Sequence, residues 1–359
     1  MRNRHSAWRV SGRLLVLAAA VIVAAAACGG TATRPGPSPS TLPVPTPTPA
    51  PTFQALVGGV EKGIAGPIDL YDSTAGTRTL QVRGTFFRFA GQGRISYLGD
   101  NGALYSQSLD GTARRTEVSG NVLEYGWGSD GTLAYVTSTK PGAPDDRGQL
   151  VIRPVSGQAA TADLGAGIAY VGIPQRAIAF SPDGKLVMVA QVTFGSNLLS
   201  VHRLDGTLQF APQGTHGAWA PDGRLYYASD TGIVVADPAT GTTKTVVSGV
   251  RWYNPTVSPD GRYVVFERQP VATGQPTALS SPPWLELLDT RTGTIVSGFR
   301  LDGGISAHFV APARFWFQIV VPQDSPAARP VLTYDLTTRT EGQTGLTGTV
   351  WDVRLGNAS

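Results

Sequence analysis

Residues that commonly do covalent chemistry are scarce in this sequence. Its 359 residues contain one cysteine, Cys28, and four histidines, of which His202, His216 and His308 lie outside the first 50 residues. The motifs HExxH and GxSxG and the glycine-rich phosphate-binding loop are absent, and a single cysteine cannot supply a zinc-binding pair. No spacing groups a serine, a histidine and a carboxylate as a catalytic triad. We therefore predict no catalytic residues, no metal site and no cofactor.

Cys28 follows a segment that is typical of protein export. Four arginines lie in the first 13 residues, and the apolar run LLVLAAAVIVAAAA follows at 14–27. This run is shorter than the roughly 20 residues that span a bilayer, and its basic, apolar, small-residue order is that of a signal peptide. A lone thiol in an exported protein has no intramolecular disulfide to form.

The sequence Ala25-Ala26-Ala27-Cys28 resembles the bacterial lipobox. The resemblance implies that residues 1–27 are removed, that Cys28 is acylated, and that the protein is anchored to the outer face of the cell membrane. The alternatives are an ordinary cleaved signal peptide or a short membrane anchor.

The segment after the cysteine predicts a tether. Residues 28–52 include eight prolines between Pro35 and Pro51 and almost no large apolar side chains. Such a segment cannot bury enough surface to fold, so we expect it to be extended and disordered.

The charge balance argues against a nucleic-acid partner. Without the four N-terminal arginines, the chain would contain 25 basic and 25 acidic residues. Binding to nucleic acid needs a basic face that displaces counterions from phosphates, and no cluster of lysine and arginine supplies one.

From Phe53 onward the sequence repeats one turn between two apolar runs. The copies are SPDGKLVMVA (181–190), APDGRLYYAS (220–229) and SPDGRYVVFE (258–267). In such a turn proline presets φ, aspartate bonds to the backbone ahead of it, and glycine takes the left-handed conformation that closes a hairpin. We therefore predict that the following residues are structural rather than catalytic: Asp183, Gly184, Asp222, Gly223, Asp260 and Gly261.

The spacing of these turns predicts the fold. Turn glycines recur at 93, 131, 184, 223 and 261, an aromatic or apolar residue usually lies four positions before each, and a second hairpin type, as in 68–80 and 233–247, lies between them. Two hairpins in about 40 residues make a four-stranded antiparallel blade, so residues 53–359 should form an all-β propeller. The C-terminal VWDVRL and the N-terminal segment 53–84 would share the blade that closes the ring. This gives seven blades, with six as the alternative.

The three repeat copies resemble those of the TolB family of WD40-like propellers. The resemblance covers about five units and implies the propeller fold. TolB itself has a separate N-terminal domain, which we do not expect here, so a role in the Tol-Pal system does not follow.

Strand parity predicts where a ligand would bind. The tight turns should share one face of the ring, and two long insertions, 139–149 and 268–284, should rise from the other, together with the crossovers between blades. Loops that vary on a rigid frame commonly carry binding sites. The candidate ligand- or partner-binding residues are Glu124, Tyr125, Arg176, His216, Trp252, Tyr253, Asn254 and His308. The alternative is that these residues only fill and seal the channel.

Three functions remain compatible with the sequence. The first is a noncatalytic binding or scaffolding lipoprotein for a protein, a peptide or a glycan. The second is a small enzyme of the lyase or hydrolase type with its site at the channel mouth, and the third is an extracytoplasmic sensor module. Binding is favoured because few titratable groups converge at the mouth.

Overall fold

The computed structural model describes most of the chain after residue 51. The described residues are 52–61, 64–91, 93–140, 147–166, 168–169, 177–193, 196–249, 252–268, 282–319 and 329–356. The predicted signal peptide (1–27), Cys28, all of the predicted tether except Thr52, the central parts of both insertions, and Arg176 lie outside these ranges. Within them every regular element is a strand, and no helix is long and apolar enough to span a membrane.

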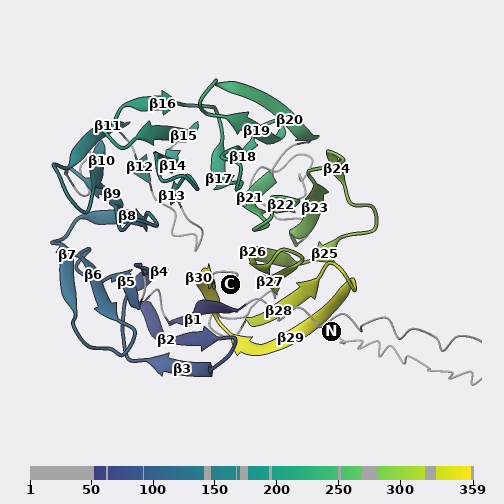
Figure 1. Cartoon of the computed structure of the whole chain (residues 1–359), viewed down its shortest axis with the longest axis horizontal. Helices are drawn as coiled ribbons and strands as arrows, with labels where there is room; N and C mark the ends of the chain where they lie inside the picture. The colour runs from purple at the N-terminus through teal and green to yellow at the C-terminus, as the bar shows by residue number, and fades with distance from the viewer. Residues whose placement is uncertain are drawn as a thin grey trace, which may run out of the picture. The chain divides into compact units, whose positions relative to one another are not determined.

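Seven antiparallel sheets are arranged around a common centre as the blades of a propeller (Figure 1). Blade 1 comprises β4 (Thr85–Phe89), β5 (Arg94–Leu98), β6 (Leu104–Ser108) and β7 (Arg115–Val118). Blade 2 comprises β8 (Val122–Trp127), β9 (Leu133–Ser138), β10 (Arg147–Arg153) and β11 (Ala160–Ala166). Blade 3 comprises β12 (Ile168–Ala169), β13 (Ile178–Phe180), β14 (Leu186–Thr193), β15 (Ser196–Arg203) and β16 (Leu208–Phe210).

Blades 4 to 6 follow the same order from the centre outward (Figure 1). Blade 4 comprises β17 (Thr215–Trp219), β18 (Leu225–Ser229), β19 (Gly232–Asp237) and β20 (Thr242–Ser248). Blade 5 comprises β21 (Trp252–Val257), β22 (Tyr263–Arg268), β23 (Trp284–Asp289), β24 (Thr294–Ile295) and β25 (Leu301–Asp302). Blade 6 comprises β26 (Gly304–Ala311), β27 (Arg314–Ile319), β28 (Pro330–Asp335) and β29 (Thr340–Thr347). Two strand positions are split, because β12 and β13 both pair with β14, and β24 and β25 both pair with β23.

Blade 7 joins the two ends of the folded region. Its inner strand is β30 (Thr349–Leu355), and its outer strands are β1 (Phe53–Glu61), β2 (Ile64–Asp72) and β3 (Gly76–Leu80). The register places Phe53 opposite Leu355. Pairing β1 with β30 in this way joins the first and last segments of the folded region in one blade and closes the ring. The prediction of an all-β propeller with seven four-stranded blades is confirmed, and the six-blade alternative is wrong.

The Pro-Asp-Gly turns join the first and second strands of their blades. At the first copy the amide of Gly184 donates to the carbonyl of Ser181 over 2.9 Å, and φ of Gly184 is 71°. The carboxylate of Asp183 accepts hydrogen bonds from the Ser181 hydroxyl and the Lys185 amide. These bonds, the Ser181 bond first, hold the pKa of Asp183 below its ordinary value. Gly223 and Gly261 have φ of 86° and 71°, and Asp222 and Asp260 accept the same backbone bond.

Strand direction fixes which loops share a face. Both long insertions connect second to third strands, β9 to β10 and β22 to β23, whereas the Pro-Asp-Gly turns connect first to second strands. Successive connections of an antiparallel sheet lie at opposite ends. The described ends of the insertions therefore lie on the face opposite the Pro-Asp-Gly turns.

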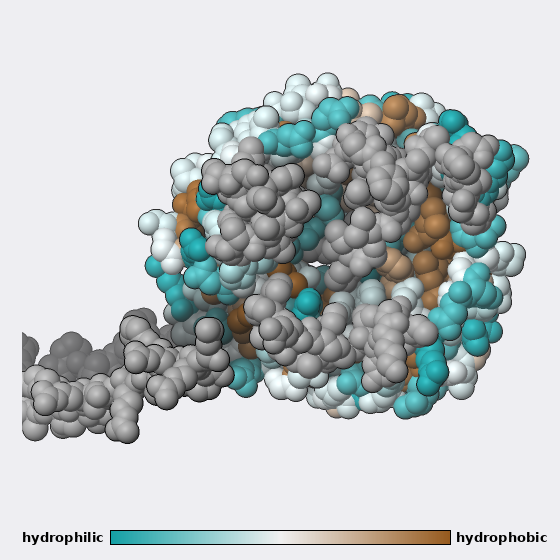
Figure 2. Space-filling view, turned by 180° about the vertical axis from the view of Figure 1, so that it is seen from behind, coloured by the Kyte–Doolittle hydropathy of each residue, from teal (hydrophilic) through white to brown (hydrophobic). Residues whose placement is uncertain are grey.

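The hydrophobic core lies between neighbouring blades. One cluster unites Leu56, Ile68 and Trp351 of blade 7 with Phe87 and Tyr97 of blade 1, and similar clusters fill the other interfaces. The outer rim carries mainly hydrophilic and intermediate side chains (Figure 2). This packing makes the ring a rigid frame for the inner strands that surround the channel.

Candidate functional site

Four of the inner strands contain a bulge with an unusual backbone conformation. Phe86, His216, Asn254 and Ser306 have φ between 38° and 54°, and the pairing register shifts at each of them. Left-handed conformations are uncommon for residues other than glycine and cost about 1–3 kcal/mol when the surroundings impose them. Bulges of this kind often re-aim side chains near functional sites. They are the crossover positions of their repeats: Phe86, His216 and Asn254 lie seven residues before the turn glycines at 93, 223 and 261, and Ser306 holds the corresponding place in blade 6.

Side chains of neighbouring strands hold two of these bulges. The hydroxyl of Tyr125, on β8, donates to the carbonyl oxygen of Phe86. The carboxylate of Glu267, on β22, accepts a hydrogen bond of 2.8 Å from the amide of Ser306 in the next blade. Both Tyr125 and Glu267 are buried. These residues therefore fix the backbone at the channel.

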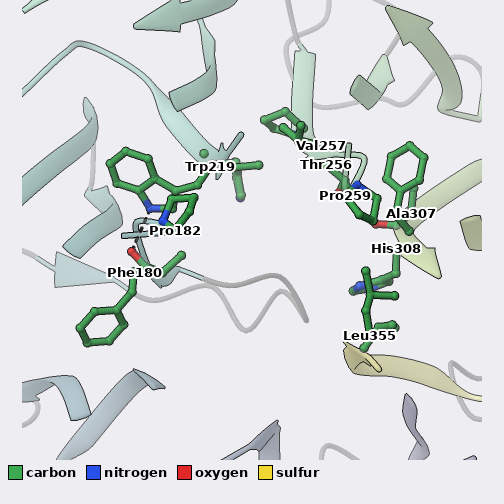
Figure 3. A pocket seen from close by; sticks show the side chains of 16 residues that line it. Phe180, Pro182, Trp219, Thr256, Val257, Pro259, Ala307, His308 and Leu355 are labelled. Atoms are coloured by element: carbon green, nitrogen blue, oxygen red, sulfur yellow. Dashed lines mark hydrogen bonds between the residues drawn. The ribbon is translucent and has the colours of Figure 1, made fainter. Parts of the chain in front are cut away.

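A cavity of about 370 Å³ lies in the channel among the inner strands of blades 3 to 7. Phe180, Pro182 and Trp219 lie on one side of it, and Pro259, His308 and Leu355 lie on the other (Figure 3). The described lining also includes Ala179, His216, Gly217, Ala218, Pro255, Thr256, Val257, Ala307, Phe309 and Val353. It thus extends from the crossover positions to the Pro-Asp-Gly turns.

Two polar side chains of this lining form hydrogen bonds to neighbouring blades. The indole nitrogen of Trp219 donates to the carbonyl of Ala179 in the preceding blade over 3.1 Å. The hydroxyl of Thr256 donates to the carbonyl of Ala307 in the following blade over 3.0 Å. These bonds leave aromatic and proline surfaces facing the cavity.

The titratable side chains among the described lining residues are two imidazoles. Nδ1 of His216 lies 2.9 Å from the hydroxyl oxygen of Thr215. Burial lowers the pKa of His216 to about 4, so this imidazole is uncharged at neutral pH. His308 comes from β26, two blades further along. The cavity is therefore largely apolar, and the imidazoles of His216 and His308 are the main polar groups of its described lining.

A buried ion pair joins blades 1 and 2. The guanidinium of Arg88 and the carboxylate of Glu124 lie 3.6 Å apart, with 4% and 2% of their side chains exposed. Arg88 also donates to the carbonyl of Trp351 over 2.6 Å, and Asp352 accepts from the amide of Phe89. Burial raises the pKa of Glu124 to about 7, although the charge of Arg88 opposes this change. The pair and Asp352 connect the inner strands of blades 7, 1 and 2.

The structure separates the residues that sequence reasoning grouped together. Two of the predicted binding residues line the cavity, namely His216 and His308. Three are buried in inner strands and are not among its lining residues, namely Glu124, Tyr125 and Asn254. Of the other three, Arg176 lies outside the described residues, and Trp252 and Tyr253 are described only as backbone of β21.

Sequence reasoning missed the aromatic and proline lining. Phe180, Trp219 and Phe309 lie four residues before the turn position of their repeats, and this periodicity was visible in the sequence. Such residues are expected in the core, so the periodicity alone gave no sign of the cavity. Pro182 and Pro259 were assigned to turns only. Arg88 was visible next to a crossover position, but its pairing with Glu124 depends on contact between blades.

The described ranges contain no group of three or more histidine, cysteine, aspartate or glutamate side chains that could hold a metal ion.

Comparisons with known proteins place the chain by fold. No protein-family model matches it, and no curated protein sequence does. A solved protein from Lactobacillus plantarum is 12% identical with a TM-score of 0.53, over 86% of this chain and 99% of that one. Oligogalacturonate lyase in complex with manganese is 11% identical with a TM-score of 0.50, over 82% and 84%. TolB from Acinetobacter baumannii is 17% identical with a TM-score of 0.46, over 85% and 82%. Similarity at these identities concerns the propeller fold alone.

Proposed function

We propose that this chain is an exported, lipid-anchored β-propeller that binds a peptide segment of a partner protein in its channel without catalysis. The observation that carries the proposal is the cavity of about 370 Å³, which is lined by aromatic and proline side chains from blades 3 to 6 and by Val353 and Leu355 of blade 7. Concave, mainly apolar sites with a few polar groups are the usual form of a ligand site.

The chemistry of the lining favours a peptide over a sugar. A sugar presents hydroxyl groups that need several hydrogen-bond partners, but Trp219 and Thr256 already donate to neighbouring blades. Aromatic and proline surfaces instead favour an apolar side chain or a proline ring. The imidazole of His216 is uncharged at neutral pH, so it places no buried charge beside an apolar segment in the cavity.

The arrangement of acids and bases favours binding over catalysis. General acid–base catalysis needs titratable groups within hydrogen-bond reach of a bound substrate. Glu124, whose pKa is raised to about 7, pairs with Arg88 and is not among the described lining residues of the cavity. The described residues that line the cavity with the two imidazoles include no aspartate or glutamate.

The anchor rests on the sequence around Cys28, the only cysteine of the chain. After removal of residues 1–27, acylated Cys28 would hold the propeller at the outer face of the cell membrane through the proline-rich segment. This segment meets the propeller at Thr52, whose carbonyl accepts a hydrogen bond from Gly356, on the face of the Pro-Asp-Gly turns. Mass spectrometry of the mature N-terminus should find lipid on Cys28 and none in Cys28→Ala. An unmodified N-terminus elsewhere would refute the anchor.

A cavity-filling variant tests the binding site. Peptides would be selected by phage display on the full-length protein in detergent, and their affinities would be compared with those for Ala218→Phe. Ala218 lines the cavity, so the phenyl ring should occupy the ligand's space and weaken the selected peptides at least tenfold, or about 1.4 kcal/mol.

The matched control is Ala239→Phe. Ala239 is exposed on the outer turn of the same blade, so this variant has the same added ring but an open cavity and should bind like wild type. Melting temperatures would show that both variants fold. Peptides that bind Ala218→Phe as tightly as wild type, or a selection without binders, would contradict the proposed function.

A further inference from the structure

A second pocket of about 510 Å³ lies at the outer part of the interface between blades 7 and 1. It is formed by residues 81–83, which lead from β3 to β4, by the turn at 99–101, and by β6 with the loop that follows it. Its lining is polar and shares no residue with the channel cavity. The site is therefore independent of the proposed peptide binding.

An arginine held over two tyrosines forms one wall of this pocket. The guanidinium carbon of Arg114 lies 4.1 Å from the ring centroid of Tyr105 and 5.9 Å from that of Tyr97, and the two rings lie 5.8 Å apart. A cation over an aromatic face is attracted by the ring quadrupole. The rings cover one face of the guanidinium, so its N–H edge is available to a ligand.

The loop that carries Arg114 is fixed by its own contacts. Ala113 has φ of 49°, a conformation that is rare for alanine and needs support from its surroundings. The support is a hydrogen bond of 3.1 Å from the Arg94 guanidinium to the Ala113 carbonyl, with a second from the same nitrogen to Ser106. Arg114 is thus positioned by a strained backbone that other residues hold in place.

A nearly buried amide points to a ligand. Gln107 lines the pocket and is only 5% exposed. Its carbonyl oxygen accepts the hydroxyl of Tyr97 over 3.3 Å, whereas its amide nitrogen donates to no residue in the described part of the chain. This nitrogen is not among the buried side-chain atoms that lack a partner, so it is reached from the pocket and can donate to an acceptor on a bound molecule.

The charges of the lining define the ligand. Arg83 and Arg114 are its cations and Asp100 its acid. A guanidinium edge matches a carboxylate in a bidentate pair, and an aspartate carboxylate accepts hydrogen bonds from hydroxyl groups. We propose that this pocket binds a hydroxylated carboxylate of the sugar-acid class. The carboxylate pairs with Arg114, the hydroxyl groups donate to Asp100, and a ligand oxygen accepts from the amide nitrogen of Gln107.

Calorimetry on the full-length protein in detergent tests this site, with D-glucuronate as the probe and D-glucose as its uncharged analogue. Wild type should bind glucuronate saturably and glucose at least tenfold more weakly. Arg114→Gln should weaken glucuronate binding about tenfold, as expected when one charge-assisted pair is lost. Gln107→Leu should weaken it as well, and its melting temperature would show whether the buried substitution preserves the fold.

The matched control is Arg300→Gln. The Arg300 guanidinium lies 4.1 Å from the ring of Trp284 and pairs with Asp302, so the change removes the same charge and the same ring contact at another place. Glucuronate affinity should remain that of wild type. Absence of saturable glucuronate binding, equal binding of glucose, or an equal loss in Arg300→Gln would each overturn the proposal. Binding of the selected peptides tests the channel separately, so the two proposals can fail independently.

Discussion

The pH dependence of stability should contain two opposite contributions from the inner strands. Burial raises the pKa of Glu124 from 4.5 to about 7 and lowers that of His216 from 6.5 to about 4. The folded protein therefore holds a proton on Glu124 that the unfolded chain releases between these values. Conversely, the unfolded chain binds a proton at His216 that the folded protein excludes.

The signs follow from proton linkage, in which stability rises with pH where the unfolded chain binds more protons. Between pH 4.5 and 7 the Glu124 contribution lowers the free energy of unfolding as the pH rises. The His216 contribution is fully present above pH 6.5 and is lost as the pH falls toward 4. At about 1.4 kcal/mol per pH unit, the pKa shift of each group changes the free energy of unfolding by about 3 kcal/mol across its pH interval. The two slopes should largely cancel between pH 4.5 and 6.5 in the wild type.

Single substitutions should separate the pH dependence of stability that Glu124 causes from the one that His216 causes. Glu124→Gln keeps the shape of the side chain and removes its titration, so its free energy of unfolding should rise with pH through this window. At pH 7 it should exceed that of wild type by up to about 3 kcal/mol, because desolvation of the Glu124 carboxylate outweighs its attraction to Arg88. His216→Asn, with a residue that tolerates φ above zero, should show the opposite slope.

Urea unfolding of the full-length protein, followed by tryptophan fluorescence at constant ionic strength, measures these slopes. The decisive comparison is the difference between each variant and wild type at every pH, because shifts common to all three proteins then cancel. If Glu124→Gln has the same pH profile as wild type, or is less stable at pH 7, the desolvation reasoning is wrong. The second result would mean that the ion pair with Arg88 is the dominant effect.

Other predictions concern the turns and one crowded glycine. Gly184→Val forces a β-branched side chain to φ of 71° and should lower the free energy of unfolding by about 1–3 kcal/mol. Asp183→Asn keeps the hydrogen-bond acceptor of the turn and should change it by no more than about 0.5 kcal/mol. Urea midpoints measure both variants, and equal costs would contradict the structural roles assigned to the two residues. At Gly232 an added Cβ would collide with the carbonyl oxygen of Val247 in the neighbouring strand. Gly232→Ala should therefore cost more than Gly241→Ala, which has φ of 71° but no atom within 4 Å of the added carbon and should cost about 1–2 kcal/mol. Similar melting temperatures for these two variants would refute this comparison.

The repeat made the fold predictable because local turn chemistry and long-range architecture agree in it. The turn glycine of each repeat lies just before a second strand, so β5 begins at Arg94 after Gly93 and β18 begins at Leu225 after Gly223. The two hairpins of each unit imply a four-stranded blade without knowledge of any distant contact. The count of seven blades depended in addition on joining the C-terminal VWDVRL to the N-terminal segment 53–84, and the spacing alone left six blades as the alternative.

The site was less predictable because its residues meet only through contacts between blades. Glu124 and His216 each lie seven residues before the turn glycine of their repeat, yet Glu124 is buried against Arg88 while His216 lines the cavity. The difference depends on the side chains of adjacent blades, which a repeat does not align. The pocket at Arg114 also depends on such a contact, between the connection at 81–83 and the turn at 99–101.

The bulges show how a propeller can keep its frame and vary its chemistry. Phe86, His216, Asn254 and Ser306 share a left-handed backbone at corresponding positions, but their side chains are aromatic, basic, amide and hydroxyl. Neighbouring side chains support the conformation at two of them, through Tyr125 at Phe86 and Glu267 at Ser306. At these two positions neighbouring side chains hold the backbone, so the residue in the bulge can change while the conformation is kept. Substitutions at the supporting residues should therefore affect stability first, whereas substitutions at His216 should affect what the channel binds.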